Sequence, residues 1–291
     1  MSERIGVIGL GVMGSAMARN LLSAGHQVLG FDIDPAKRST FVDIGGEAAG
    51  SAGDVGRTVD VLVLSLPTTS ALAEVTAEIA QRAHPGLVAL ETGTFPLQDK
   101  LDARQALAAA GIDVLDTPLS GTGLQATDAT LVVFASGSRD GYEKARPVFD
   151  AIARSTHYLG EFGNGSRMKY IANLLVAVHG LAAAEAHALG IAAGLDPARV
   201  QEVMEDGVGS SKIFEIRGPM MVENDYPPAA RLDILLKDAT IISEFARSVG
   251  APTPLLDAAL PIYRDSSEAG LGGLDAAALC RYLEGLGGLE R

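Results

Sequence analysis

The chain has 291 residues, of which 47% are hydrophobic and 20% are charged, a composition typical of a well-packed globular protein with one large domain or two ordinary ones. Its net charge of −13 argues against nucleic-acid binding, which needs a basic face to neutralise phosphates. The single cysteine, Cys280, cannot form an internal disulfide and favours a reducing compartment, and the first residues lack the profile of a secretion signal. We therefore expect a cytoplasmic protein.

The first predicted element is an apolar strand that leads into three glycines in the frame G-x-G-x-x-G, followed by a helix over residues 15–23. In such a unit the glycines permit a tight turn, close approach of a pyrophosphate, and close packing of helix on strand. The helix dipole and free N–H groups would hold the phosphates. This context favours a dinucleotide site over a flavodoxin-like fold without nucleotide, with cofactor contacts from Gly9, Leu10, Gly11, Val12, Met13 and Gly14.

A second strand, residues 27–31, ends in Asp32. A carboxylate at this distance from the glycines accepts from a ribose 2′-hydroxyl and repels a 2′-phosphate. The sequence therefore predicts NAD as cofactor, preferred over NADP. Arg38 opposes this preference, because it could reach a 2′-phosphate.

Further strands are expected at residues 61–66, 87–91 and 112–115, separated by helices. This alternation predicts a parallel sheet covered on both faces, with ligands beyond the carboxyl ends of the strands. The residues at these ends should share one rim; they are Asp32, Leu66, Pro67, Thr92 and Ser120.

Near residues 159–165 the pattern changes to a long alanine-rich helix, about residues 166–194, followed by further helical segments. We predict an α/β fold in which residues 1–163 form a Rossmann NAD-binding domain. Residues 164–291 would form an all-helical domain for substrate binding and dimerisation, joined by the long helix.

The long helix is apolar enough to suggest a membrane span, but His179, Glu185 and His187 interrupt it. A core or dimer helix is the favoured interpretation. Because Leu174, Leu175, Val176 and Leu181 lie on more faces than one core can cover, we expect a homo-oligomer, a dimer or a tetramer.

Four blocks of sequence occur in a fixed order: residues 9–14, residues 116–121, residues 163–173 with Gly163-Asn164-Gly165, and residues 236–238. Together they resemble the 3-hydroxyacid (β-hydroxyacid) dehydrogenase family, with its 3-hydroxyisobutyrate, L-threonate and tartronate semialdehyde enzymes. The resemblance spans essentially the whole chain. It implies an NAD-dependent oxidoreductase that moves a hydride between the nicotinamide and the hydroxyl carbon of a small or medium 3-hydroxy acid, or forms that acid from its semialdehyde or keto acid.

The resemblance also assigns catalytic roles. Lys169 would be the general acid/base, and Asn173 lies four residues on, on the same helix face. Ser120, Gly121 and Asn173 would hold the acid, Ser120 and Gly121 offering a hydroxyl and backbone N–H groups to its carboxylate. The alternative for Lys169 is a solvated surface lysine, and the alternative for Ser120 and Gly121 is an ordinary turn.

Two further positions are assigned to the cofactor. Thr92 lies where the family contacts the nicotinamide ribose, and Lys237 matches a second lysine near cofactor and substrate. The alternative for Lys237 is a surface salt bridge with Asp233, one helical turn before it. A cleft between the two domains would exclude water.

Two positions differ from the family pattern: Thr122 and Ala129 stand where glycines are usual, in the loop that holds the substrate carboxylate. Leu124 adds an apolar wall nearby. We therefore expect a changed pocket in which 3-hydroxyisobutyrate is a poor substrate.

No metal is expected, because the five histidines form no ligand cluster. Two other functions remain open. An imine reductase would share the architecture, but that branch replaces the lysine found here at position 169. A non-catalytic nucleotide-binding sensor or scaffold is disfavoured by the joint presence of Lys169, Asn173 and Lys237.

Overall fold

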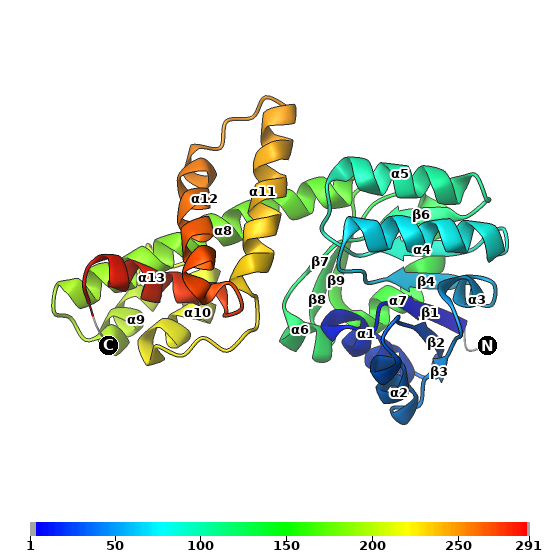
Figure 1. Ribbon diagram of the computed structural model, residues 1–291, viewed down its shortest axis with the longest axis horizontal. Helices are drawn as coiled ribbons and strands as arrows, with labels where there is room; N and C mark the ends of the chain where they lie inside the picture. The colour runs from blue at the N-terminus through cyan, green and yellow to red at the C-terminus, as the bar shows by residue number, and fades with distance from the viewer. Residues whose placement is uncertain (1–3, 290–291) are drawn as a thin grey trace. The chain divides into compact units, whose positions relative to one another are not determined.

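The computed structural model describes residues 4–289, which form two compact units, one up to Lys169 and one from Tyr170 onward (Figure 1). The division falls within the long helix α8, Asn164–Ala192, so this helix supplies side chains to both units. The boundary expected at residue 163 therefore stays a prediction.

The first unit is built on a six-stranded sheet whose order is β3-β2-β1-β4-β5-β6, with every pair parallel. This order is that of the dinucleotide-binding Rossmann domain, and it confirms the predicted fold class. The strands are β1 (Arg4–Ile8), β2 (Gln27–Phe31), β3 (Glu47–Ala48), β4 (Val61–Leu64), β5 (Val88–Glu91) and β6 (Asp113–Asp116).

Helices cover both faces of this sheet, which explains why its strands are apolar at successive positions. In β4, Val61 and Val63 pack with α1 and α7, whereas Leu62 and Leu64 pack on the opposite side with α3, α4 and α5. The helices are α1 (Val12–Ser23), α2 (Pro35–Asp43), α3 (Ala52–Gly56), α4 (Thr69–Arg82), α5 (Leu97–Ala108) and α7 (Arg139–Ile152).

A second, three-stranded sheet follows in the order β7-β8-β9. Its strands are β7 (Leu119–Ser120), β8 (Leu131–Ala135) and β9 (Ala153–Tyr158). The sequence predicted parallel pairing only, but β7 and β8 are antiparallel. The reason is length: the connection between them holds only the short helix α6, Gly123–Thr127, and a parallel pair needs a crossover of a dozen residues or more.

The second unit is helical, as predicted, and packs around the buried side of α8, which carries Tyr170, Ala177, Leu181 and Ala184. Inside it, Arg217 forms a buried ion pair with Asp275. The remaining helices are α9 (Pro197–Glu205), α10 (Lys212–Glu223), α11 (Leu232–Ser248), α12 (Pro254–Ser266) and α13 (Leu279–Leu286).

By length and composition α8 could cross a membrane, with a mean hydropathy of 1.6 in its most apolar window. A core helix passes the same test. His187, one of the polar residues that interrupt the stretch, is fully buried, stacks on Phe214 and bonds the Ala183 carbonyl. These contacts are those of a helix packed within protein.

Candidate active site

The carboxyl ends of the parallel strands form one edge in the first unit, and backbone hydrogen bonds continue past the strand ends. Gly9 N donates to the Phe31 carbonyl at 2.9 Å, and Thr92 N donates to the Leu64 carbonyl at 3.1 Å. The structure therefore brings the glycine-rich loop, Asp32 and Thr92 to the same edge, with Leu66 and Pro67 following β4 between them.

The three glycines of the loop serve different purposes. A Cβ at Gly9, whose φ is +90°, would lie 2.1 Å from the Ser65 carbonyl oxygen, and a Cβ at Gly14 would lie 1.8 Å from the Gly9 oxygen. A Cβ at Gly11 would meet no described protein atom within 4 Å. The loop is thus tightly packed on its inner side and open at Gly11, which is the shape that a pyrophosphate requires.

The start of α1 is also suited to an anion. Gly11 is its N-cap and provides no side-chain hydrogen bond, whereas Asp34 and Thr68 cap α2 and α4 with their side chains. The first N–H groups of α1 can therefore bind phosphate oxygens, and the residues present fit a dinucleotide.

Asp32 is buried and anchors both the glycine-rich loop and the backbone that follows β2. Its Oδ2 accepts from Leu10 N at 2.8 Å, and its Oδ1 accepts from Asp34 N at 2.9 Å. Each carboxylate oxygen retains a second lone pair for a ribose hydroxyl. Arg38 donates to the Asp32 carbonyl at 2.5 Å and lies over the Phe31 ring, while Lys37 Nζ is 3.6 Å from the carboxylate.

Thr92 is buried, and its hydroxyl donates to the Leu64 carbonyl at 2.7 Å. The donor is therefore used within the protein, and the oxygen can only accept from a ligand hydroxyl.

Ser120 ends β7 and pairs with Val132, and the following loop turns sharply at Gly121, whose φ is +142°. A Cβ there would lie 2.7 Å from a Leu131 methyl group, so the turn needs glycine. Thr122 directs both its N–H and its hydroxyl to the Gln125 side chain. Its polar groups are thus used inside the loop.

This loop packs against the dinucleotide loop within the same unit. A Cβ at Gly123 would lie 2.9 Å from a methyl group of Val12, and Asn20 donates to the Ala126 carbonyl at 2.7 Å. The structure therefore places the predicted carboxylate-binding loop beside the predicted pyrophosphate loop.

Lys169 lies in the second turn of α8 and is only 9% exposed, so it is not a solvated surface lysine. The start of this helix is anchored on the first unit. Ser166 N donates to Asp116 Oδ2 at 2.7 Å, and Gly165 N donates to the Ser136 hydroxyl at 2.9 Å.

Asn173 and Lys237 meet at one carboxylate in the second unit. Asn173 Nδ2 donates to Asp238 Oδ2 at 2.8 Å, and Lys237 Nζ lies 3.0 Å from Asp238 Oδ1. Asp233, the alternative partner expected for Lys237, forms an ion pair with Arg231.

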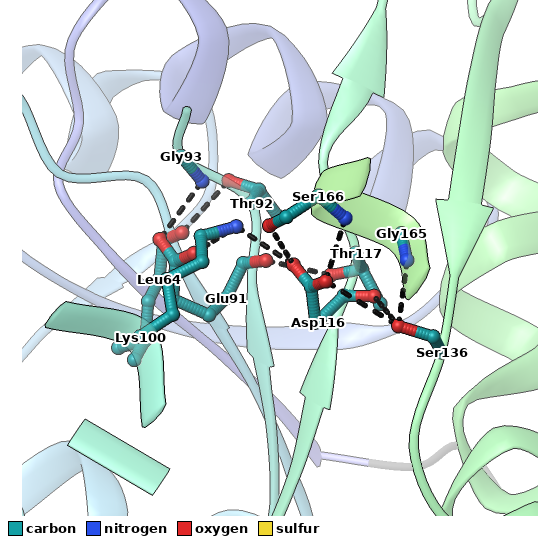
Figure 2. Close-up of polar contacts among 10 residues, drawn as sticks. All are labelled: Leu64, Glu91, Thr92, Gly93, Lys100, Asp116, Thr117, Ser136, Gly165 and Ser166. Carbon is teal, nitrogen blue, oxygen red and sulfur yellow. Dashed lines mark hydrogen bonds and ion pairs between the residues drawn. The ribbon is translucent and has the colours of Figure 1, made fainter. Parts of the chain in front are cut away.

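One polar cluster was missed by sequence reasoning (Figure 2). Lys100 of α5 is fully buried, with Nζ 2.6 Å from Glu91 Oε2 and 2.7 Å from Asp116 Oδ1. Burial raises the pKa of Glu91, although Lys100 opposes the shift. Burial also disfavours the charged form of Lys100, but Asp116 and Glu91 outweigh it, and the pKa of Lys100 is raised.

A signal for this cluster was present in the sequence. Glu91 and Asp116 are the last residues of adjacent strands and pair in register. Two carboxylates side by side in a buried sheet require a cation, and Lys100 lies on the helix that connects the two strands.

Comparison with known proteins agrees with this geometry. Residues 4–160 match the family model of the NAD-binding domain of 6-phosphogluconate dehydrogenase, and residues 163–283 match that of the NAD-binding region of NADP-dependent 3-hydroxyisobutyrate dehydrogenase. The chain is 36% identical to an L-threonate dehydrogenase of Cupriavidus necator, over 98% of both chains. It is 32% identical to an NAD-dependent L-serine dehydrogenase of Pseudomonas aeruginosa, over 90% of this chain and 91% of that one.

A solved 3-hydroxyisobutyrate dehydrogenase from Salmonella typhimurium superposes with a TM-score of 0.88 at 32% identity, covering 97% of this chain and all of the other. An imine reductase of Streptomyces aurantiacus gives 0.67 at 21% identity, over 97% of this chain and 99% of that one, a likeness of fold alone. The chain therefore belongs to the 3-hydroxyacid dehydrogenase family, whose members are NAD(P)-dependent oxidoreductases acting on the hydroxyl group of hydroxy acids.

Proposed function

We propose that this chain oxidises a small, polyhydroxylated 3-hydroxy acid with NAD, and that Lys169 takes the proton from the reacting hydroxyl. One observation carries the proposal. Lys169 is buried, one turn beyond a helix start that Asp116 ties to the carboxyl end of β6, the edge at which the dinucleotide loop lies.

Each residue has a distinct part in this reaction. When bound, the nicotinamide accepts the hydride from the alcohol carbon. Lys169, as the neutral amine, accepts the hydroxyl proton and returns it in the reverse direction. Ser120 and Gly121 hold the carboxylate with the hydroxyl and backbone N–H groups, and Asn173 accepts from a substrate hydroxyl.

The substrate class follows from the loop and from the relatives. Thr122 fills space where the family pattern has glycine, and Leu124 beside it is exposed. Several relatives at 31–36% identity are L-threonate dehydrogenases, whose substrate carries a hydroxyl on every carbon except the carboxylate. We therefore expect a sugar acid of this type to be turned over faster than 3-hydroxyisobutyrate.

The preference for NAD rests on Asp32, whose carboxylate faces the position of a ribose 2′-hydroxyl in this fold. A homo-oligomer is supported by α8, where Ile171, Leu175 and Leu189 remain exposed in the single chain. An imine reductase is disfavoured because that branch lacks the lysine that is buried here.

Turnover and NAD binding by Lys169→Ala and Lys169→Arg test the proposal. General acid–base assistance is worth about 10²–10⁴-fold, so Lys169→Ala should lose at least that order of kcat. Lys169→Arg should be nearly as inactive, because guanidinium does not release its proton near neutral pH. NAD affinity, measured by calorimetry, should stay nearly unchanged.

Lys212→Ala is the matched control, since Lys212 is exposed and pairs with Glu215 on its own helix. The acids to compare are L-threonate, L-serine and 3-hydroxyisobutyrate. If Lys169→Ala keeps more than about a tenth of wild-type kcat, the base lies elsewhere and Lys237 becomes the candidate.

A further inference from the structure

Asp116 joins two parts of the first unit through its two carboxylate oxygens (Figure 2). Oδ1 accepts from Lys100 Nζ at 2.7 Å and from the Ser166 hydroxyl at 2.8 Å. Oδ2 accepts from Ser166 N at 2.7 Å and from the Ser136 hydroxyl at 3.3 Å. Asp116 is therefore fully buried, and both of its carboxylate oxygens are hydrogen-bonded.

These bonds cap the first turn of α8 from outside the helix. The first N–H groups of a helix have no partner within it, and a carboxylate at this end also interacts favourably with the dipole. A cap supplied by a strand residue 50 positions earlier fixes where the helix begins as well as stabilising it.

The start of α8 is packed closely against the backbone of the first unit. A Cβ at Gly165 would lie 2.3 Å from the Phe134 carbonyl oxygen and 2.7 Å from the Asp116 carbonyl oxygen. The backbone of α8 thus rests directly on β6 and β8, and Lys169 follows Ser166 by three residues on the same helix.

Lys100 holds Asp116 and Glu91 side by side through its ammonium group. Without a cation, two buried carboxylates would face each other, and burial already raises the pKa of the neighbouring Glu91. Without the ammonium, repulsion between the two carboxylates would displace Asp116 and weaken its hold on Ser166.

We propose that Lys100 is a positioning residue for catalysis: through Asp116 and Ser166 it sets the place of Lys169 at the nucleotide-binding edge. The inference rests on the proposed role of Lys169 as proton acceptor. Lys100 itself touches neither substrate nor cofactor, because its ammonium is enclosed between Glu91 and Asp116.

The experiment is a pair of double-mutant cycles in the full-length enzyme, with Ser166→Ala and Lys100→Met each made alone and with Lys169→Ala. A misplacement of about 1 Å costs on the order of 10²-fold in rate, so each single variant should lower kcat by roughly 10–100-fold. In the Lys169→Ala background the same changes should alter kcat less than about twofold, because they act through the missing lysine. NAD affinity should be unchanged.

The second readout is the pH dependence of kcat in Ser166→Ala, which can be measured even if Lys169→Ala is inactive. Oxidation requires the neutral amine, so the rate rises with pH through the pKa of the base. In Ser166→Ala the displaced base has different surroundings, so the pH at which this limb rises should change.

Thr117→Val is the matched control. It also removes a buried hydroxyl, one that donates to the Glu91 carbonyl at 3.2 Å, but it leaves the Asp116–Ser166 bonds intact. Its kcat and pH profile should match the wild type. Ser166→Ala removes a single hydroxyl, so it serves even where Lys100→Met fails to fold.

Two results would overturn the positioning role alone. One is a wild-type kcat in Ser166→Ala. The other is an equal loss of kcat in the wild-type and Lys169→Ala backgrounds, together with an unchanged pH profile. High activity in Lys169→Ala overturns the proposed function and this inference together. The two failures are therefore distinguishable.

Discussion

Asn173 Nδ2 donates to Asp238 Oδ2 at 2.8 Å, and this bond fixes which way the Asn173 amide faces. With its NH2 group directed at the carboxylate, the amide oxygen is presented on the opposite side. An acceptor one helical turn beyond Lys169 suits a substrate hydroxyl better than a carboxylate. Under the proposed function, the substrate carboxylate would then be held by Ser120 and Gly121.

Asp238→Asn is therefore expected to impair catalysis. A neutral amide at 238 lets the Asn173 amide adopt either orientation and removes the ion pair with Lys237. Losing one charge-assisted hydrogen bond corresponds to about 1.5–3 kcal/mol, so kcat/KM for the hydroxy acid should fall by roughly 10–150-fold. Steady-state kinetics at saturating NAD would measure it. Asp233→Asn on the same helix, which removes a charge from the pair with Arg231, should leave kcat/KM nearly unchanged, and a matching loss there would count against the assignment.

The proposed preference for NAD rests on Asp32. The wild-type enzyme should use NAD more efficiently than NADP, and Asp32→Ala should weaken NAD by ~10–150-fold. Because Asp32 also holds Leu10 N, the variant should gain little affinity for NADP. The ratio of kcat/KM for the two cofactors is the measurement. Asp34→Ala, which removes the cap of α2, should cost ~1 kcal/mol of stability with that ratio unchanged. Equal use of both cofactors by the wild type would refute the preference.

Ala129 has a left-handed backbone conformation, with φ of +53°. This conformation costs a residue with a Cβ roughly 1–2 kcal/mol, against an entropic penalty of about 0.4–1 kcal/mol for placing glycine there. Ala129→Gly should therefore stabilise the protein by roughly 0.5–1 kcal/mol and raise Tm by about 1–4 °C. Thermal unfolding would show it. Asn224→Gly, at another positive-φ non-glycine position, loses the hydrogen bond that its side chain accepts from Arg281 Nε and should give no gain. An unchanged or lower Tm for Ala129→Gly would contradict the account.

The exposed side of α8 predicts self-association. Ile171 and Leu175 are 58% and 47% exposed and lie four residues apart on one helix face. Leu175→Glu should shift the enzyme toward monomers in sedimentation velocity, because a charge would be buried in the interface. Leu101→Glu is a suitable control at another exposed apolar position. A wild-type mass equal to the monomer at all concentrations would end the idea.

Much of the fold was predictable because its signals are local. The strand over residues 27–31 was predicted at both ends, since it is buried on both faces and ends at an acid. The antiparallel β7–β8 pair was not, because two residues carry no periodicity. The contacts of Lys100 were missed, because the signal lies in two carboxylates 25 residues apart that only strand pairing brings together. Contacts between residues far apart in the chain give only a weak signal in a single sequence.

The open space at Gly11 separates two kinds of constraint on neighbouring glycines. Gly9 and Gly14 are enclosed by the chain itself, whereas Gly11 is not. In a library of all substitutions, selection for folded protein alone should deplete variants at the two enclosed positions and retain alanine at Gly11. Alanine at position 11 should be depleted only by selection for growth on the hydroxy acid. Because the fold does not require glycine at position 11, retention of Gly11 under growth selection would indicate that the enzyme must bind a nucleotide.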